Sequence, residues 1–156
     1  MVWYEEDFYA WTQEQAAALL KAAQERLNLH PPLDYENLAE EIEGLGGRDR
    51  REVINRLVTL LEHLLKLPHS PAQDRRRGWR RIVQEQRSAI DLVLADSPSL
   101  RSRLPEFLSK AWPWARAAAI DILDEQDGID AHALPDACLW TVEQVLDPDF
   151  WPEGRS

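Results

Sequence analysis

The feature that most constrains the fold is a helical period of apolar residues in the middle of the chain. Seven apolar side chains recur every three to four positions there: Val53, Ile54, Leu57, Leu60, Leu61, Leu64 and Leu65. An α-helix turns once every 3.6 residues, so it places all of them on one broad face. Pro68 cannot continue a helix. The sequence therefore predicts a helix from about Asp49 to Leu67 with a large buried face.

Capping signals predict where three other helices begin. Thr12-Gln13-Glu14-Gln15 and Thr141-Val142-Glu143-Gln144 both have the spacing of a capping box, in which the Thr and Gln side chains satisfy free backbone N–H groups. Asp34 is placed to cap a short acidic helix. We expect that helix to end at Gly46-Gly47, because glycine readily adopts the left-handed conformation that ends helices.

Stop signals delimit the rest of the chain. A helix is predicted from about Asp74 to Ala95, followed by a stop and restart in which Ser97 is the N-cap and Pro98 the first helical residue. The next helix runs through Pro113 and ends before Gly128. Apolar and polar residues nowhere alternate long enough to form a sheet. With 156 residues, the chain is predicted to be a single all-α domain, residues 1–156, a bundle of about five to six helices.

Composition restricts the compartment and the class of partner. The single cysteine, Cys138, excludes an internal disulfide and fits a reducing compartment. No apolar stretch approaches the roughly 20 residues needed to span a bilayer, and the first residues are acidic where a signal peptide is basic. These features predict a cytoplasmic protein without membrane attachment. The net charge of −10 opposes binding to nucleic acid and favours a partner with a basic surface.

One segment of the chain is basic, in contrast to the negative net charge of the whole. It places five arginines around a tryptophan: Arg75, Arg76, Arg77, Trp79, Arg80 and Arg81. Such a segment could neutralise and stack on a single nucleic-acid strand. The alternative, which we prefer, is that its arginines pair with the many carboxylates of the chain. It is also a candidate surface for a protein partner.

A search for catalytic and metal-binding patterns yields no candidate. Metal sites in helical bundles use Glu-x-x-His pairs, whereas Glu62 and His63 are adjacent, which suits a solvated face and an ion pair from Glu62 to Lys66. Cys138 has no basic neighbour that would lower its pKa, so we interpret it as a small buried side chain. We therefore expect no catalytic residues, no bound metal and no cofactor.

Two polar residues lie on or beside predicted apolar faces. Gln86 is near the middle of the face formed by Trp79, Ile82, Val83, Ala89, Ile90, Val93 and Leu94. Glu41 lies beside the stripe of Leu38, Ile42 and Leu45. We expect Gln86 to be largely buried and hydrogen-bonded, and Glu41 to be partly buried near an arginine. The candidate partners of Glu41 are Gln86, Arg80 and Arg87. Together these residues would form either a structural hydrogen-bond network or a ligand site.

Several phrases resemble one family when taken in order along the chain. They are YEEDFYAWTQEQAAALL, NLAEEIEGLG, LLEHLLKL, WRRIVQEQRSAI, DSPSLR and TVEQVLDPDFWPE. From Tyr4 to Pro152 the sequence resembles the bacterial family called domain of unknown function 29. The resemblance implies a single helical domain of bacterial origin. It implies no activity, and no catalytic residues carry over from it.

Three functions agree with these observations. The first is a non-enzymatic protein–protein interaction module, antitoxin-like in that an acidic surface covers a basic partner. The second is a small ligand-binding or enzymatic bundle that uses Glu41, Gln86 and the nearby arginines. The third is nucleic-acid binding through residues 75–81. The outer face of a helical bundle is compatible with either a monomer or a self-associated form.

Overall fold

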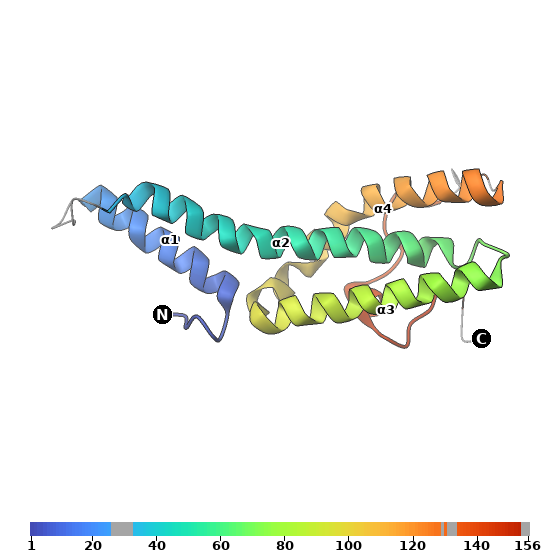
Figure 1. Ribbon diagram of the computed structural model, residues 1–156, viewed down its shortest axis with the longest axis horizontal. Helices are drawn as coiled ribbons and strands as arrows, with labels where there is room; N and C mark the ends of the chain where they lie inside the picture. The colour runs from blue at the N-terminus through green and yellow to red at the C-terminus, as the bar shows by residue number, and fades with distance from the viewer. Residues whose placement is uncertain (26–32, 129, 131–133, 154–156) are drawn as a thin grey trace. The chain divides into compact units, whose positions relative to one another are not determined.

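The computed structural model describes residues 1–25, 33–128, 130 and 134–153. Its elements are α1 (Phe8–Glu25), α2 (Tyr35–Lys66), α3 (Gln73–Asp96), the 3-10 helix η1 (Pro98–Arg103), α4 (Leu104–Asp127) and α5 (Val142–Leu146) (Figure 1). No strand occurs in the part of the chain described. The all-α prediction is therefore confirmed.

The chain divides into two compact units. The N-terminal unit comprises Met1–Glu52 and Val93–Ser102, and the main unit comprises Val53–Leu92 and Arg103–Ser156. Both α2 and α3 contribute residues to each unit. The expectation of one folding domain remains a prediction.

The main unit is built on an antiparallel pair, the second half of α2 and the part of α3 that follows the short connection. Arg56 Nη1 donates to Gln86 Oε1 over 3.3 Å, while Lys66 Nζ lies 4.9 Å from the ring centre of Trp79. As the residue number rises along α2 it falls along α3, so the two segments are antiparallel, as in Figure 1. The predicted α2 face is buried here, with Val53, Leu57, Leu60, Leu61, Leu64 and Leu65 at most 3 % exposed.

The predicted helix end at Gly46-Gly47 is wrong, because α2 continues through both glycines to Lys66. Gly46 is buried against α1, and a β-carbon on it would overlap the hydroxyl oxygen of Thr12. Glycine here permits a close approach of two helices while keeping helical dihedral angles. Its cost in helix propensity, about 1 kcal/mol, is small beside the hydrogen bonds of an uninterrupted helix.

The predicted start of the first helix is also wrong. α1 begins at Phe8, and Asp7 caps it by accepting a hydrogen bond from the backbone N–H of Ala10 (2.8 Å). Thr12 lies inside the helix, fully buried, and donates to the carbonyl oxygen of Tyr9 (2.7 Å). The Thr12 signal failed because a buried threonine can bond back to its own helix.

The predicted restart at Ser97-Pro98 is only partly right, because Pro98–Arg103 form the 3-10 helix η1 and α4 begins at Leu104 without a side-chain cap. The Ser97 hydroxyl accepts from the backbone N–H of Tyr9 (3.0 Å) and donates to Asp49 (3.0 Å).

Three other helix ends agree with the sequence. Asp34 accepts from the backbone N–H of Asn37 at the start of α2, and α4 passes through Pro113 and ends at Gly128 in the left-handed conformation (φ 61°). Thr141 and Gln144 form the predicted capping box before α5. Local signals were sufficient at these three helix ends.

Candidate functional site

The proposed pair of Glu41 and Gln86 is not a buried network. Glu41 is exposed on the part of α2 that belongs to the N-terminal unit, so the expectation that it would be partly buried is wrong. Gln86 is half-buried in the main unit and accepts a hydrogen bond from Arg56. Its hydrogen bonding is confirmed, but its burial is less than expected.

Arg87 occupies the central position that the sequence suggested for Gln86. It is 2 % exposed. The buried residues of α3 are Trp79, Val83, Arg87, Ile90 and Leu94, spaced four, four, three and four apart. The predicted face of α3 was therefore rotated by about one residue. Half-buried apolar residues on one side of the true stripe made Gln86 look central.

Arg87 is buried because its guanidinium binds backbone carbonyl groups of the C-terminal segment. Nε donates to the carbonyl of Val145 (2.8 Å) and Nη2 to that of Phe150 (3.0 Å). Burial lowers the pKa of Arg87 from its ordinary value, although the carboxylate of Asp147 acts in the opposite direction. The sequence suggested Arg87 only as a candidate partner of Glu41, because the carbonyl acceptors lie about 60 residues away in the chain.

Arg80 has a similar role in the main unit. Its Nε donates to Glu153 Oε1 (2.6 Å), and its guanidinium lies 5.0 Å from the ring centre of Trp151. Arg87 lies 5.1 Å from the same ring. Gln84 adds a hydrogen bond to the carbonyl of Pro148. Both arginines of the proposed ligand site thus hold the C-terminal segment on α3.

Most arginines of the basic segment also bind groups of the chain itself. Arg75 donates to Gln126 (2.9 Å) and Asp127 (2.6 Å), and Arg76 donates to the carbonyl of Ser70 (2.7 Å). Arg81 pairs with Glu85 one helical turn away (3.0 Å). Among the residues described, Arg77 is exposed and makes no recorded pair.

Trp79, the aromatic residue of this segment, is 8 % exposed and packs beneath Lys66. A buried ring offers no face on which a base could stack. Together with the paired arginines, this favours the interpretation of residues 75–81 as part of the scaffold. Their role in binding a partner stays an untested prediction.

Neither Glu62 nor His63 lies on the solvated face that the sequence predicted, since the Glu62 side chain is 20 % exposed and that of its partner Lys66 is 4 % exposed. Lys66 Nζ donates to Glu62 Oε1 (2.9 Å), which is the predicted ion pair. His63 is not on a solvated face, since it is 9 % exposed and its Nδ1 lies 2.7 Å from the carbonyl oxygen of Thr59. Burial lowers the pKa of His63, so the neutral imidazole is favoured. The described residues contain no group of three metal-binding side chains.

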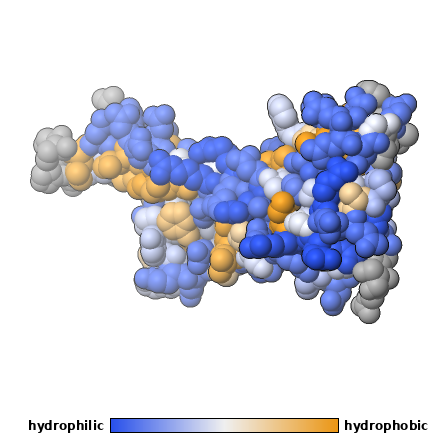
Figure 2. All heavy atoms as spheres, turned by 45° about the vertical axis from the view of Figure 1, so that its right-hand side comes forward, coloured by the Kyte–Doolittle hydropathy of each residue, from blue (hydrophilic) through white to orange (hydrophobic). Residues whose placement is uncertain are grey.

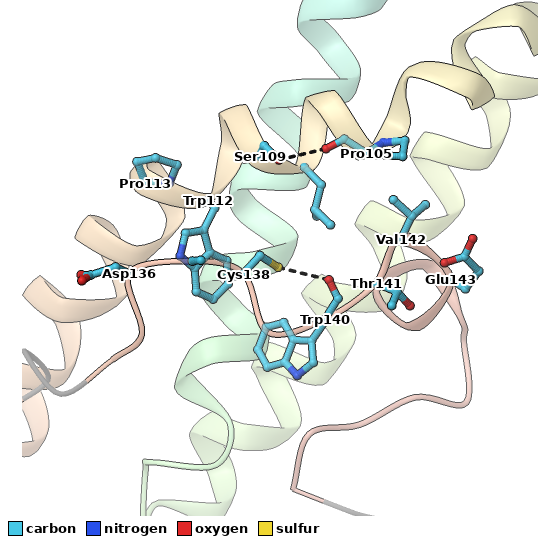
Figure 3. A pocket seen from close by; sticks show the side chains of 12 residues that line it. Pro105, Ser109, Trp112, Pro113, Asp136, Cys138, Trp140, Thr141, Val142 and Glu143 are labelled. Carbon is cyan, nitrogen blue, oxygen red and sulfur yellow. Dashed lines mark hydrogen bonds between the residues drawn. The ribbon is translucent and has the colours of Figure 1, made fainter.

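A pocket of about 550 Å³ lies in the main unit between the first half of α4 and residues 136–143 (Figure 3). Trp112 and Trp140 line it, with ring centres 6.0 Å apart in an edge-to-face arrangement. Asp136 and Glu143 lie at opposite ends of the lining in Figure 3. The sequence offered no signal for this pocket, because two distant segments form it.

Cys138 lines the same pocket and is half-buried. Its thiol donates to the carbonyl of Trp140 (3.4 Å). Burial raises the pKa of the thiol, so the unreactive protonated form dominates near neutral pH. The sequence predicted a buried Cys138, whereas the side chain is only half-buried.

The N-terminal unit leaves apolar side chains exposed. The buried residues of its helices α1 and α2 include Tyr9, which lies against Gly46, and the smaller residues Thr12, Ala16, Ala39 and Gly46. Leu20, Leu38 and Leu45 are 38–41 % exposed, and we refer to these three as the leucine ridge. The predicted stripe of Leu38, Ile42 and Leu45 therefore does not face α1. Figure 2 shows hydrophobic residues on the surface of this part of the molecule.

Comparison with known proteins now identifies the family. The family model described as domain of unknown function DUF29 matches residues 3–151. The chain belongs to this family. A crystal structure of an alpha-helical protein of unknown function from Rhodospirillum rubrum is similar, with 26% sequence identity and a TM-score of 0.80. The match covers 96% of this chain and 92% of that one. No curated protein matches.

Membership of the DUF29 family agrees with the helical fold and assigns no activity. The protein from Rhodospirillum rubrum is likewise described as of unknown function. Within the described residues, none of the helices combines the length and the apolar character that crossing a bilayer requires. Function has to be argued from the surfaces of this chain.

Proposed function

We propose that this chain is a non-enzymatic interaction module whose N-terminal unit binds a basic, amphipathic helix of another protein. Such a module resembles an antitoxin in one respect, because an acidic surface covers a basic partner. The leucine ridge carries the proposal. Leu20, Leu38 and Leu45 are 38–41 % exposed, although each belongs to the apolar pattern of its helix.

The spacing of the exposed residues suits a helical partner. Leu38, Ile42 and Leu45 are four and three residues apart on α2, so they form one stripe along the helix. Ile42 is half-buried. An amphipathic helix binds such a surface with anchor residues at the same spacing. Exposed apolar patches of this kind commonly mark protein-binding sites.

The charge beside the stripe selects a basic partner. Glu36, Glu40, Glu41 and Glu43 are all exposed, and the sequence has no lysine or arginine between Tyr35 and Gly47. Lysines or arginines flanking the apolar face of a partner helix would therefore meet carboxylates on docking. Complementary charge of this kind raises the association rate and disfavours acidic competitors.

Aromatic residues near the start of the chain supply further candidate anchors. Trp3 and Tyr4 are 61% and 53% exposed. The Tyr4 ring stands edge-on to Phe8 and Trp11, with ring centres 5.6 and 5.0 Å apart. Tyrosine and tryptophan are enriched among the residues that dominate binding energy. Pre-positioned rings lose little conformational freedom on binding.

The proposal is tested with labelled amphipathic peptides and fluorescence anisotropy. One peptide has leucines at helical spacing and lysines on its other face, and a second has the same composition in scrambled order. We expect the amphipathic peptide to bind the full chain at least about tenfold more tightly than the scrambled one, a difference of about 1.4 kcal/mol. The double variant Leu38→Gln/Leu45→Gln should lose this preference.

Leu92→Gln is the matched control. Leu92 is 71% exposed but belongs to the main unit, so its replacement should leave peptide binding unchanged. Equal binding of the two peptides would show that charge alone is responsible and would overturn the proposal. Loss of binding in the Leu92→Gln control would also overturn it.

A further inference from the structure

We propose that the pocket between α4 and residues 136–143 binds a ligand with a cationic head on an apolar body of about the size of an aromatic ring. The pocket belongs to the main unit, whereas the leucine ridge belongs to the N-terminal unit. The inference is therefore independent of the function proposed above. It rests on the size, the walls and the charge of the pocket.

The size of the pocket suits a small organic ligand or one or two amino-acid residues. Its volume of about 550 Å³ lies within the roughly 300–1,000 Å³ typical of ligand sites. Apolar residues make much of the wall, although Pro105 and Pro113 among them are exposed. Pro105, Leu108 and Pro113 of α4 face Val142 of α5 across it.

Trp140 gives the pocket an affinity for cations, and the buried ring of Trp112 supports it from behind. Trp112 is 2 % exposed and is fixed by a hydrogen bond from its Nε1 to the carbonyl of Pro135 (3.3 Å). Trp140 is half-buried and packs edge-on against it, and also against Phe150. The face of an indole ring attracts cations, and the attraction is worth about 0.5–2 kcal/mol. The Trp140 ring is held in place by these contacts, so its accessible face is ready for a ligand.

The charged residues that line the pocket are both acidic. Asp136 and Glu143 contribute, and no lysine, arginine or histidine does. Asp136 is engaged loosely by Arg116, at 3.5 Å. Glu143 is exposed, and its carboxylate has no recorded partner in the described part of the chain. A ligand cation near Glu143 would gain a charge partner without breaking an existing ion pair.

Cys138 makes binding measurable, because it lines the pocket and the chain contains one cysteine. Burial raises the pKa of the thiol, so alkylation of Cys138 by iodoacetamide, a neutral reagent, is slow and is followed over hours at pH 9 by mass spectrometry of the full chain. We expect 4-phenylbutylamine to slow the reaction saturably. Its uncharged analogue 4-phenylbutanol should need at least about tenfold higher concentration, and 4-phenylbutyrate should not protect.

Replacement of Glu143 tests the role assigned to charge. Glu143→Gln should remove the preference for the amine over the alcohol, with both compounds then protecting weakly. Glu125→Gln is the control, because Glu125 is exposed on α4 and does not line the pocket. Equal protection by the amine and the alcohol in the unmodified chain, or no protection by either, would overturn the proposal.

A peptide arm distinguishes the two sources of such a cation. N-acetyl-Phe-Arg-amide is compared with the same peptide carrying neutral citrulline instead of arginine. If the arginine peptide protects Cys138 at lower concentration than 4-phenylbutylamine, the ligand is a basic side chain of a polypeptide. If 4-phenylbutylamine protects at the lower concentration, the ligand is a free organic amine. The Leu38→Gln/Leu45→Gln variant should behave like the unmodified chain in both arms, so failure of the peptide-docking proposal would not affect this result.

Discussion

At the scale of single residues, the position of Arg87 shows how a charged side chain can occupy a buried stripe. Its methylene groups continue the apolar face between Val83 and Ile90, while its guanidinium nitrogens reach the carbonyls of Val145 and Phe150. A buried arginine with such acceptors satisfies groups that would otherwise lose their water. Arg87 therefore joins the C-terminal segment to α3.

Replacing Arg87 with methionine should destabilise the fold. Arg87→Met keeps an apolar stem but leaves both carbonyl groups without a donor, which costs about 1–3 kcal/mol. Arg77→Met is the matched control on the exposed side of α3 and should change stability by less than about 0.5 kcal/mol. Urea unfolding monitored by circular dichroism measures both. Equal effects of the two substitutions would contradict the role assigned to Arg87.

His63 should make stability depend on pH. Burial lowers its pKa below the ordinary value of the unfolded chain, which is about 6.5. Just below that pH the unfolded chain binds more protons than the folded one, so the free energy of unfolding falls as the pH is lowered. The stability that depends on a neutral His63 is fully present above the pKa of His63 in the unfolded chain. It is lost as the pH falls through the lower pKa of His63 in the folded chain.

The expected result is a loss of stability between pH 7.5 and 5.5 that is smaller in His63→Gln. His69→Gln is the control, because His69 is exposed, and it should keep the slope of the unmodified chain. Urea unfolding at several pH values gives the slopes. A His63→Gln variant with an unchanged slope would show that other groups are responsible.

At the scale of elements, the contact between α1 and α2 depends on small residues. Ala16 of α1 and Ala39 and Gly46 of α2 are buried, which brings the two backbones close together. Tyr9 of α1 also packs against Gly46, whereas Leu20, Leu38 and Leu45 lie outside this contact as the leucine ridge. The packing of α1 on α2 thus has two consequences. It brings small residues of the two helices close together, and it leaves an apolar stripe exposed.

Two glycines of α2 should respond in opposite directions to alanine. Gly44→Ala places a methyl group in open space on a helix and should raise stability by about 0.5–1 kcal/mol. Gly46→Ala brings a methyl group against Thr12 and should lower stability by about 1–3 kcal/mol. Thermal unfolding compares the pair. If both variants gained stability, the close approach of α1 to α2 would be absent in solution.

At the scale of the whole molecule, buried residues are distributed unequally among the helices. The buried residues of α1 are Tyr9, Thr12 and Ala16. Those of α4 are Leu104, Phe107, Leu108, Ala111, Trp112, Ala115, Ala119 and Leu123. Local stability follows the amount of packed apolar surface. The helices of one chain should therefore open at different free energies.

Hydrogen exchange measures this difference directly. We expect the backbone amides of α1 to exchange faster than those of α4 under native conditions, by at least about tenfold, because opening α1 exposes less apolar surface. Exchange followed by mass spectrometry of peptic fragments resolves the two helices. Equal protection of α1 and α4 would mean that the chain opens as one cooperative unit.

Much of the fold could be predicted from the amino-acid sequence because the relevant signals act within one or two helical turns. The apolar period from Val53 to Leu65 predicted the buried face of α2, and the capping box at Thr141 predicted the start of α5. Asp34 likewise predicted the start of α2. The family resemblance was confirmed over residues 3–151.

Tertiary structure decided what depends on residues far apart in the chain. Gly46 remains inside a helix because α1 packs against it, and Thr12 is buried for the same reason. Arg87 is buried because Val145 and Phe150 supply acceptors from about 60 residues away. The pocket around Trp112 and Trp140 exists because a C-terminal segment crosses α4. Whether a residue is buried depends on the other elements that pack against its helix. The apolar period along one helix therefore predicts how wide the buried face is, but it does not predict which residue lies at the centre of that face.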